Sequence, residues 1–155
     1  MISSRIALQS AIVAVAVALG GCGSMSNSSS AQSEAASKVS TLAAQLSGTS
    51  EVPPVKTGGA GFLTATYEHN TRTLTWAATY SGLSGPATAA HFHGPAEPGQ
   101  NAGVVVPFPS AASPIQGTAT LTPAQEADLL AGRWYVNVHT AQNPGGEIRG
   151  QVKPL

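Results

Sequence analysis

The fold is decided by residues 61–80, GFLTATYEHNTRTLTWAATY. Residues 61–67 and 72–80 are rich in Thr, Ala and aromatic side chains and read as two β-strands. The second strand alternates: one face would hold Leu74, Trp76, Ala78 and Tyr80, and the other Thr73, Thr75, Ala77 and Thr79. Residues 68–71, EHNT, form the turn, because Asn tolerates left-handed backbone angles. The segment therefore predicts a hairpin with one buried face.

Strand signals recur along the rest of the chain. Further strands are predicted over residues 87–93, 104–106, 115–121, 133–140 and 147–153. Residues 39–46 suit a short helix or a strand, and we favour a strand from about residue 41 to 48. One helix is predicted. Thr122 is its N-cap, Pro123 is at its first position, Gln125 hydrogen-bonds back to the N-cap, and Gly132 ends it.

Seven or eight short strands with one short helix indicate an all-β fold. We predict a Greek-key antiparallel β-sandwich. Its expected core contains Phe62, Leu74, Trp76, Tyr80, Trp134, Val136 and Val138.

The N-terminus has the features of a secretory signal. Arg5 precedes a mainly apolar run over residues 6–19, which is too short to span a membrane comfortably and ends in small residues. The sequence Leu19-Gly20-Gly21-Cys22 resembles the lipobox of bacterial lipoproteins, which implies cleavage before Cys22 and lipid attached to it. The alternative is a plain signal peptide with an incidental cysteine. Cys22 is the only cysteine, so an intramolecular disulfide is excluded.

The expected organisation is a lipoprotein signal peptide over residues 1–21, a lipidated flexible tether over 22–40 and one domain over 41–155. We expect an exported protein whose Cys22 lipid inserts into a bacterial membrane. Ser24 favours the outer membrane facing the periplasm, with the cell surface as the alternative. The chain from Cys22 keeps six basic and seven acidic residues and no basic patch, which argues against nucleic acid as a partner.

Three of the four histidines lie in two short runs, AHFHGP at residues 90–95 and YVNVHT at 135–140. His91 and His93 would project from the same face of one strand, and His139 from a neighbouring strand would complete a three-nitrogen metal site. Imidazoles without a thiolate suit Cu(II), Zn(II) or Ni(II), and divalent affinity is highest for copper. Zinc with three histidines and a water is the alternative. His69, at the hairpin tip, is expected to be solvent-exposed.

The neighbours of His139 suggest supporting roles. Tyr135 and Asn137 share its face, which we expect to be polar and accessible, and Tyr135, Asn137 or Glu147 would bond an imidazole and fix its tautomer. Arg149 either forms a surface ion pair with Glu147, supports a histidine or attracts an anion. The competing interpretation is structural, with the histidines bonding backbone carbonyls or pairing with Glu147.

Five segments form an ordered set that resembles the CHRD domain, first described in chordin and found in many bacterial secreted proteins. They are LSG at 46–48, EVPP at 51–54, AHFHGPA at 90–96, YVNVHT at 135–140 and PGGEIRGQV at 144–152. The resemblance spans about residues 41–152. The family is defined by sequence more than by an activity, and its members in larger extracellular proteins imply a non-catalytic module.

A second resemblance bears on chemistry. SGLS at 81–84 followed by AHFH at 90–93 is similar to the Gly-Leu loop and His-x-His strand of Cu/Zn superoxide dismutases, and VNVH at 136–139 to a late strand of those enzymes. This implies a superoxide-dismutase-like sandwich with His91, His93 and His139 as copper ligands. No histidine lies between His93 and His139, so the bridging histidine is missing, as are the zinc ligands, and the register of Arg149 differs.

Two hypotheses follow from the sequence. In the first, a lipid-anchored CHRD domain binds one copper ion for copper handling or redox chemistry, with catalysis left undecided because the dismutase ligand set is incomplete. In the second, the domain is a non-catalytic interaction or structural module of the cell envelope with a protein partner. Imidazoles more than about 8 Å apart would exclude a shared ion, because metal–nitrogen bonds are about 2 Å long.

Overall fold

The computed structural model describes residues 38–155. The predicted signal peptide, Cys22 and nearly all of the predicted tether lie outside these residues. The described elements follow in the order β1 (Val39–Ser47), η1 (Gly48–Ser50), β2 (Ala60–Glu68), β3 (Thr73–Ser81), β4 (Ala87–His93), β5 (Val104–Pro107), β6 (Ile115–Thr120), α1 (Pro123–Leu130), β7 (Trp134–Thr140) and β8 (Ile148–Pro154). No helix in this part of the chain combines the length and apolar character that crossing a membrane requires.

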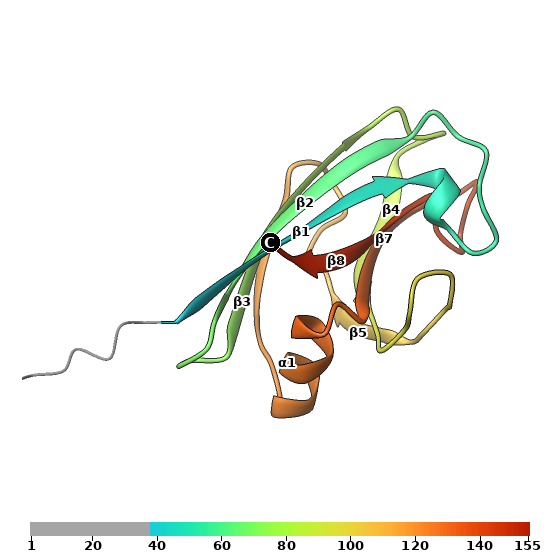
Figure 1. Ribbon diagram of the computed structural model, residues 1–155. Coiled ribbons are helices and arrows are strands. Elements are labelled where there is room, and N and C mark those ends of the chain that lie inside the picture. Colours follow the sequence, from blue (N-terminus) through green and yellow to red (C-terminus); the bar gives the residue numbers. More distant parts are fainter. Residues whose placement is uncertain (1–37) are drawn as a thin grey trace, which may run out of the picture. The chain divides into compact units, whose positions relative to one another are not determined.

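The strands form one antiparallel sheet in the order β5-β4-β7-β8-β1-β2-β3-β6. The prediction of an all-β fold with one short helix is confirmed. Four strands separate β4 from β3 in the sheet, yet Phe92 of β4 meets Trp76 of β3 edge to face, with ring centroids 5.2 Å apart. The sheet therefore curls back and encloses the core between its two halves (Figure 1).

The β2–β3 hairpin pairs from Ala60 with Ser81 to Glu68 with Thr73. The predicted alternation is confirmed, because Leu74 and Trp76 are buried whereas the threonines between and beyond them face outward. The prediction that Phe62 belongs to the core is wrong: it is 49% exposed. The inner positions of β2 are Leu63, Ala65 and Tyr67. A side chain one position away must point to the opposite face.

The hairpin turn differs from the prediction in two ways. Arg72, with φ 53°, takes the left-handed conformation that the sequence assigned to Asn70. His69 is partly buried rather than free in solvent: its Nε2 lies 2.9 Å from Ser40 Oγ and its Nδ1 lies 3.3 Å from Glu126 Oε1. The end of the hairpin is thus tied to β1 and α1.

Helix α1 begins as predicted. Thr122 Oγ1 accepts a hydrogen bond from Gln125 N, and Gln125 Oε1 accepts one from Thr122 N, which completes a capping box. Leu129 is the fully buried residue of the helix.

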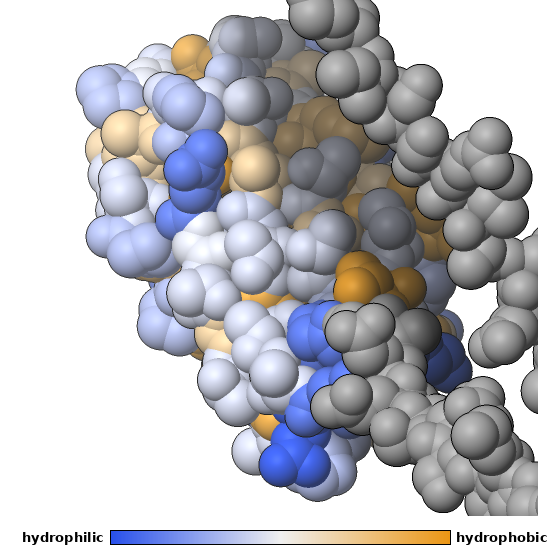
Figure 2. Space-filling view, turned by 90° about the vertical axis from the view of Figure 1, so that its left-hand side faces the viewer, coloured by the Kyte–Doolittle hydropathy of each residue, from blue (hydrophilic) through white to orange (hydrophobic). Residues whose placement is uncertain are grey.

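On the outside of the domain, the face shown in Figure 2 is mostly of intermediate hydropathy, with strongly hydrophilic residues in small separate groups.

One close approach in the core depends on a glycine. Gly117 of β6 pairs with Trp76 of β3, so the two residues face the same side of the sheet. A Cβ on Gly117 would lie 2.2 Å from Trp76 Cζ2. The indole therefore occupies the space that a side chain on β6 would need.

Candidate metal centre

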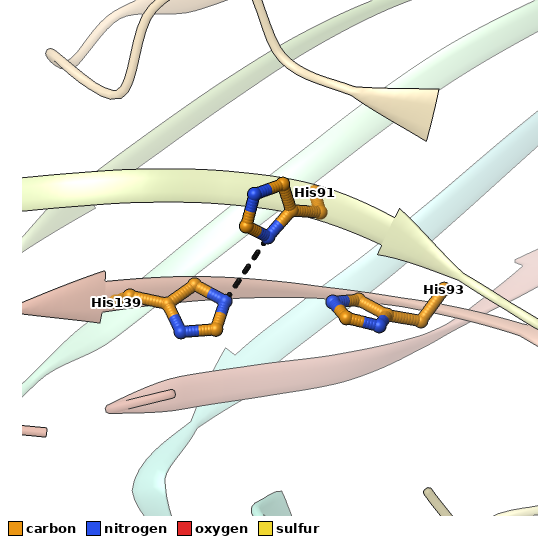
Figure 3. A group of neighbouring side chains, drawn as sticks. All are labelled: His91, His93 and His139. Carbon is orange, nitrogen blue, oxygen red and sulfur yellow. Dashed lines mark hydrogen bonds between the residues drawn. The ribbon is translucent and has the colours of Figure 1, made fainter. Parts of the chain in front are cut away.

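The three clustered histidines lie on the adjacent strands β4 and β7, on the face turned away from the core. In the β4–β7 register, His91 is opposite Asn137 and His93 is opposite Tyr135, with His139 two residues further along β7. The residues between them, Phe92 and Val136 among them, are buried in the core. The structure brings the three imidazoles together, with one potential ligand atom from each within 4.8 Å of the others (Figure 3).

The hydrogen bonds assign the proton on two of the rings. His93 Nδ1 lies 3.0 Å from the Ala102 carbonyl, and His139 Nδ1 lies 2.9 Å from the Pro144 carbonyl. A carbonyl can only accept, so both Nδ1 atoms carry the hydrogen, and in the neutral rings both Nε2 atoms keep a lone pair. Metal-bound histidines show this pattern, with the non-ligating nitrogen donating to a carbonyl.

The other ring nitrogens of His93 and His139 differ in their contacts. His93 Nε2 is buried without a hydrogen-bond partner. His139 Nε2 lies 3.1 Å from His91 Nδ1, the contact drawn in Figure 3, and 2.9 Å from Asn137 Oδ1. The structural alternative predicted carbonyl contacts, and these exist, but they occupy only one nitrogen of His93 and of His139.

The charge state of the cluster also suits a cation. Burial lowers the pKa of His91, and His139 and His93 lower it further. Burial likewise lowers the pKa of His93, with the Ala102 carbonyl and the Asn137 side chain opposing the shift. Neutral imidazole is the form that binds a metal ion.

If the metal–nitrogen bonds are about 2.1 Å long, two ligand nitrogen atoms of one ion are at most about 4.2 Å apart, which is the separation on opposite sides of the ion. The limit of 4.8 Å on the ligand-atom separations is close to this value and far below the 8 Å that would exclude a shared ion. Closing a 4.8 Å separation to bonding distance takes a movement of about 0.6 Å.

Tyr135 and Arg149 form a stack on His93. The Tyr135 ring is parallel to the His93 ring within 2°, with centroids 4.8 Å apart, and the Arg149 guanidinium carbon lies 3.4 Å from the Tyr135 centroid. Arg149 also donates to the Gln100 carbonyl at 2.6 Å and to Asn101 Oδ1 at 2.9 Å. Burial lowers the pKa of Arg149, against the effects of Tyr135 and Glu51.

These contacts hold the loop that contains Gln100, Asn101 and Ala102 over the sheet. The Ala102 amide donates to the Tyr135 hydroxyl at 3.2 Å. As a result, the prediction of an open, accessible face is wrong for Tyr135 and Asn137, each 3% exposed, whereas His91 and His139 remain partly exposed.

Glu147 lies in a separate network. It is fully buried, and its carboxylate accepts hydrogen bonds from the Thr57 hydroxyl, the Ser84 amide and hydroxyl, the Thr140 hydroxyl and the Asn143 amide. Burial disfavours its charged form, but these bonds outweigh burial and lower its pKa to about 2. The predicted surface ion pair with Arg149 is wrong, because both residues are buried. Glu147 instead joins the loops around Thr57, Ser84 and Asn143.

Sequence reasoning missed Glu51. It is 4% exposed, and its Oε1 is buried without a hydrogen-bond partner. Burial raises its pKa, with the positive charge of Arg149 opposing the shift. Gly146, with φ 124°, passes so close that a Cβ there would lie 2.2 Å from Glu51 Oε1 and 2.6 Å from Asn137 Nδ2. A signal was present in the sequence: Glu51 is a charged residue beside a Pro-Pro turn in a chain with only 9% charged residues.

Residues 42–152 match the family model of the CHRD domain. The protein belongs to the CHRD family. The matched region of this CHRD domain contains the three clustered histidines, Asn137, Arg149 and Glu51. No curated protein and no solved structure shows significant similarity to the chain. The family resemblance predicted from the sequence is confirmed.

Proposed function

We propose that the CHRD domain binds one copper ion through His91, His93 and His139. The observation that carries the proposal is the buried Nε2 of His93, which has no partner and belongs to a cluster with the Nε2 of His139, itself 3.1 Å from His91 Nδ1. An unpaired buried polar atom destabilises a fold by about 1–3 kcal/mol, and a bound cation removes that penalty. Three imidazoles without a thiolate favour Cu(II), with Zn(II) as the alternative.

The proposed role is copper handling or redox chemistry at a single ion. Within residues 38–155, the three histidines are the one group of His, Cys, Asp or Glu side chains arranged to hold a metal. A second metal and a bridging histidine therefore have no counterpart in this part of the chain. For this reason we favour transfer or storage of one copper ion over superoxide dismutation.

We further propose that the domain works outside the cytoplasm, anchored by lipid on Cys22 to the outer membrane, facing the periplasm or the cell surface. The proposal rests on the short apolar segment before Leu19-Gly20-Gly21-Cys22. The tether would run from residue 22 to the start of β1 at Val39. Mass spectrometry of the protein from membranes tests this: diacylglyceryl-modified Cys22 is expected, and an unmodified thiol contradicts it.

The proposed description of the fold is a Greek-key sandwich of the superoxide-dismutase type. It is supported by the non-sequential neighbours β4–β7 and β8–β1, and by the contact of Trp76 with Phe92 across the core. An experimental structure compared with those enzymes tests it.

The decisive experiment measures metal content and copper affinity. Protein recovered from its exported compartment should carry about one copper per chain, and the metal-free protein should bind Cu(II) with 1:1 stoichiometry in calorimetry. His93→Ala and His139→Ala should each lower the affinity by at least about tenfold. His69→Ala is the matched control, since His69 contacts Ser40 and Glu126 instead. Equal affinity in the cluster variants and the control contradicts the proposal.

The second candidate function is a non-catalytic interaction module of the cell envelope. It is favoured by Phe62, which is 49% exposed on the outer face of β2, paired in register with Thr79 of β3. This candidate predicts protein without stoichiometric metal and an envelope partner whose binding is lost in Phe62→Ser but kept in His93→Ala. The opposite pattern supports the copper site.

A further inference from the structure

A fourth donor atom points into the histidine cluster. Asn137 is on β7 directly opposite His91, and its Oδ1 lies 2.9 Å from His139 Nε2. Because His139 Nδ1 donates to the Pro144 carbonyl, Nε2 of the neutral ring has no hydrogen to give. Two lone pairs thus face each other at hydrogen-bond distance, and a cation bound between them would be a partner for both.

The far side of the Asn137 amide fixes which atom faces the histidines. A Cβ added to Gly146 would lie 2.6 Å from Asn137 Nδ2 and 2.2 Å from Glu51 Oε1, so both atoms lie beside Gly146. The negative carboxylate attracts the amide N–H dipole although Oε1 accepts no hydrogen bond, so the amide nitrogen belongs on that side and the amide oxygen belongs on the histidine side. The Asn137 side chain also favours the charged form of Glu51, as the Arg149 charge does.

The separations fit neighbouring ligands of one ion. Two ligand atoms about 2.0 Å from a metal are about 2.8 Å apart at a right angle and about 3.3 Å apart at the tetrahedral angle. Asn137 Oδ1 and His91 Nδ1 lie 2.9 Å and 3.1 Å from His139 Nε2. Both contacts fall within this range without any movement of the side chains.

Burial explains why Glu51 is needed. Asn137 is 3% exposed and Glu51 is 4% exposed, so solvent does not set the orientation of the amide. The Glu51 carboxylate has one buried oxygen without a partner, and Gly146 keeps the space between it and the amide free of a side chain. Arg149, paired in register with Asn137 on β8, supplies the balancing positive charge.

We propose that Asn137 Oδ1 is the fourth ligand of the metal ion and that Glu51 is the positioning residue that turns this oxygen toward the site. The inference rests on the proposed three-histidine copper site and completes it as an N₃O set. An amide oxygen is a hard donor, so the set favours Cu(II) over Cu(I).

The test is electron paramagnetic resonance and calorimetry of the protein loaded with one equivalent of Cu(II). Asn137→Ala should lower Cu(II) affinity by at least about tenfold and change the copper hyperfine coupling. Asn137→Asp, which retains an oxygen donor, should restore the affinity with a spectrum shifted by the added charge. Glu51→Gln should alter the same spectral parameters, whereas Glu97→Gln, a change at an exposed carboxylate, should leave them unchanged.

The outcomes separate the two proposals. Wild-type protein that binds copper, together with an Asn137→Ala variant of unchanged spectrum and affinity, overturns the fourth ligand and leaves the histidine site standing. If Asn137→Ala does not fold, Asn137→Asp decides, because an unchanged spectrum there also overturns the inference. A wild-type spectrum retained in Glu51→Gln overturns the positioning role. Wild-type protein that binds no copper overturns both proposals.

Discussion

Glu147→Gln tests the buried network that joins three loops beside the histidine cluster. The side chains have the same shape, but Gln places an NH₂ group where one carboxylate oxygen accepts hydrogen bonds. At Oε1 the donors are Thr57 and the Ser84 amide, and at Oε2 they are Ser84 Oγ, Thr140 and Asn143. The substitution therefore removes the negative charge, and it places the NH₂ group of Gln against other hydrogen-bond donors.

The magnitude follows from the pKa of Glu147. A decrease from 4.5 to about 2 on folding corresponds, at about 1.4 kcal/mol per unit, to about 3 kcal/mol of stability at neutral pH. Because the folded-state pKa is the lower one, this contribution is complete above pH 4.5 and is lost as the pH falls toward 2. Glutamine resembles the protonated acid, so wild type and variant should differ by about 3 kcal/mol at pH 7 and converge near pH 2.

The assay is urea denaturation from pH 7 to pH 2.5, followed by the fluorescence of the buried Trp76 and Trp134. Comparison at each pH cancels the titration of groups common to both proteins. Glu97→Gln, a change at an exposed carboxylate, is the control and should parallel wild type. A difference between wild type and Glu147→Gln that stays constant across this range refutes the reasoning.

Three further predictions concern other parts of the domain. Gly117→Ala should destabilise by about 1–3 kcal/mol through its overlap with Trp76, and an unchanged urea midpoint would contradict the packing. Arg149→Lys should release the loop held through Gln100 and Asn101, so amide hydrogen exchange at Ala102 should accelerate while that of the β2–β3 hairpin does not; equal rates in both proteins would refute it. Cu(II) at about 100 times its dissociation constant should stabilise wild type by about 2.7 kcal/mol, and His93→Ala should reduce this increase to about 1.4 kcal/mol or less in calorimetric melting; a shift equal in the two proteins argues for nonspecific binding.

The hairpin and the histidine cluster were predictable because each depends on local periodicity. Alternation along β3 predicts which residues face inward, and the spacing of His91 and His93 places both on one face. Phe62 shows where periodicity fails. Both Phe62 and Leu63 are apolar, so composition alone did not indicate which of the two β2 faces packs on the core.

The burial of the site was not predictable from its strands. Alternation shows which face a side chain takes, but not which loop covers that face. The Ala102 loop follows β4 and folds back over the site, where Tyr135 and Arg149 hold it. Glu51 reaches the site from the segment between η1 and β2, beside Gly146. Glu147 shows the same limit, because its five donors come from four residues in three separate segments and leave no spacing pattern.

The unpartnered Nε2 of His93 has an evolutionary consequence. In the metal-free state this buried nitrogen weakens the fold by about 1–3 kcal/mol, so an apolar ring at the same position gives a more stable protein. Under the proposed copper site, a chain that no longer encounters the ion would gain stability by replacing His93, and so would a laboratory selection for heat resistance in chelated medium. A histidine kept at this position in related chains would then record continued exposure to the metal.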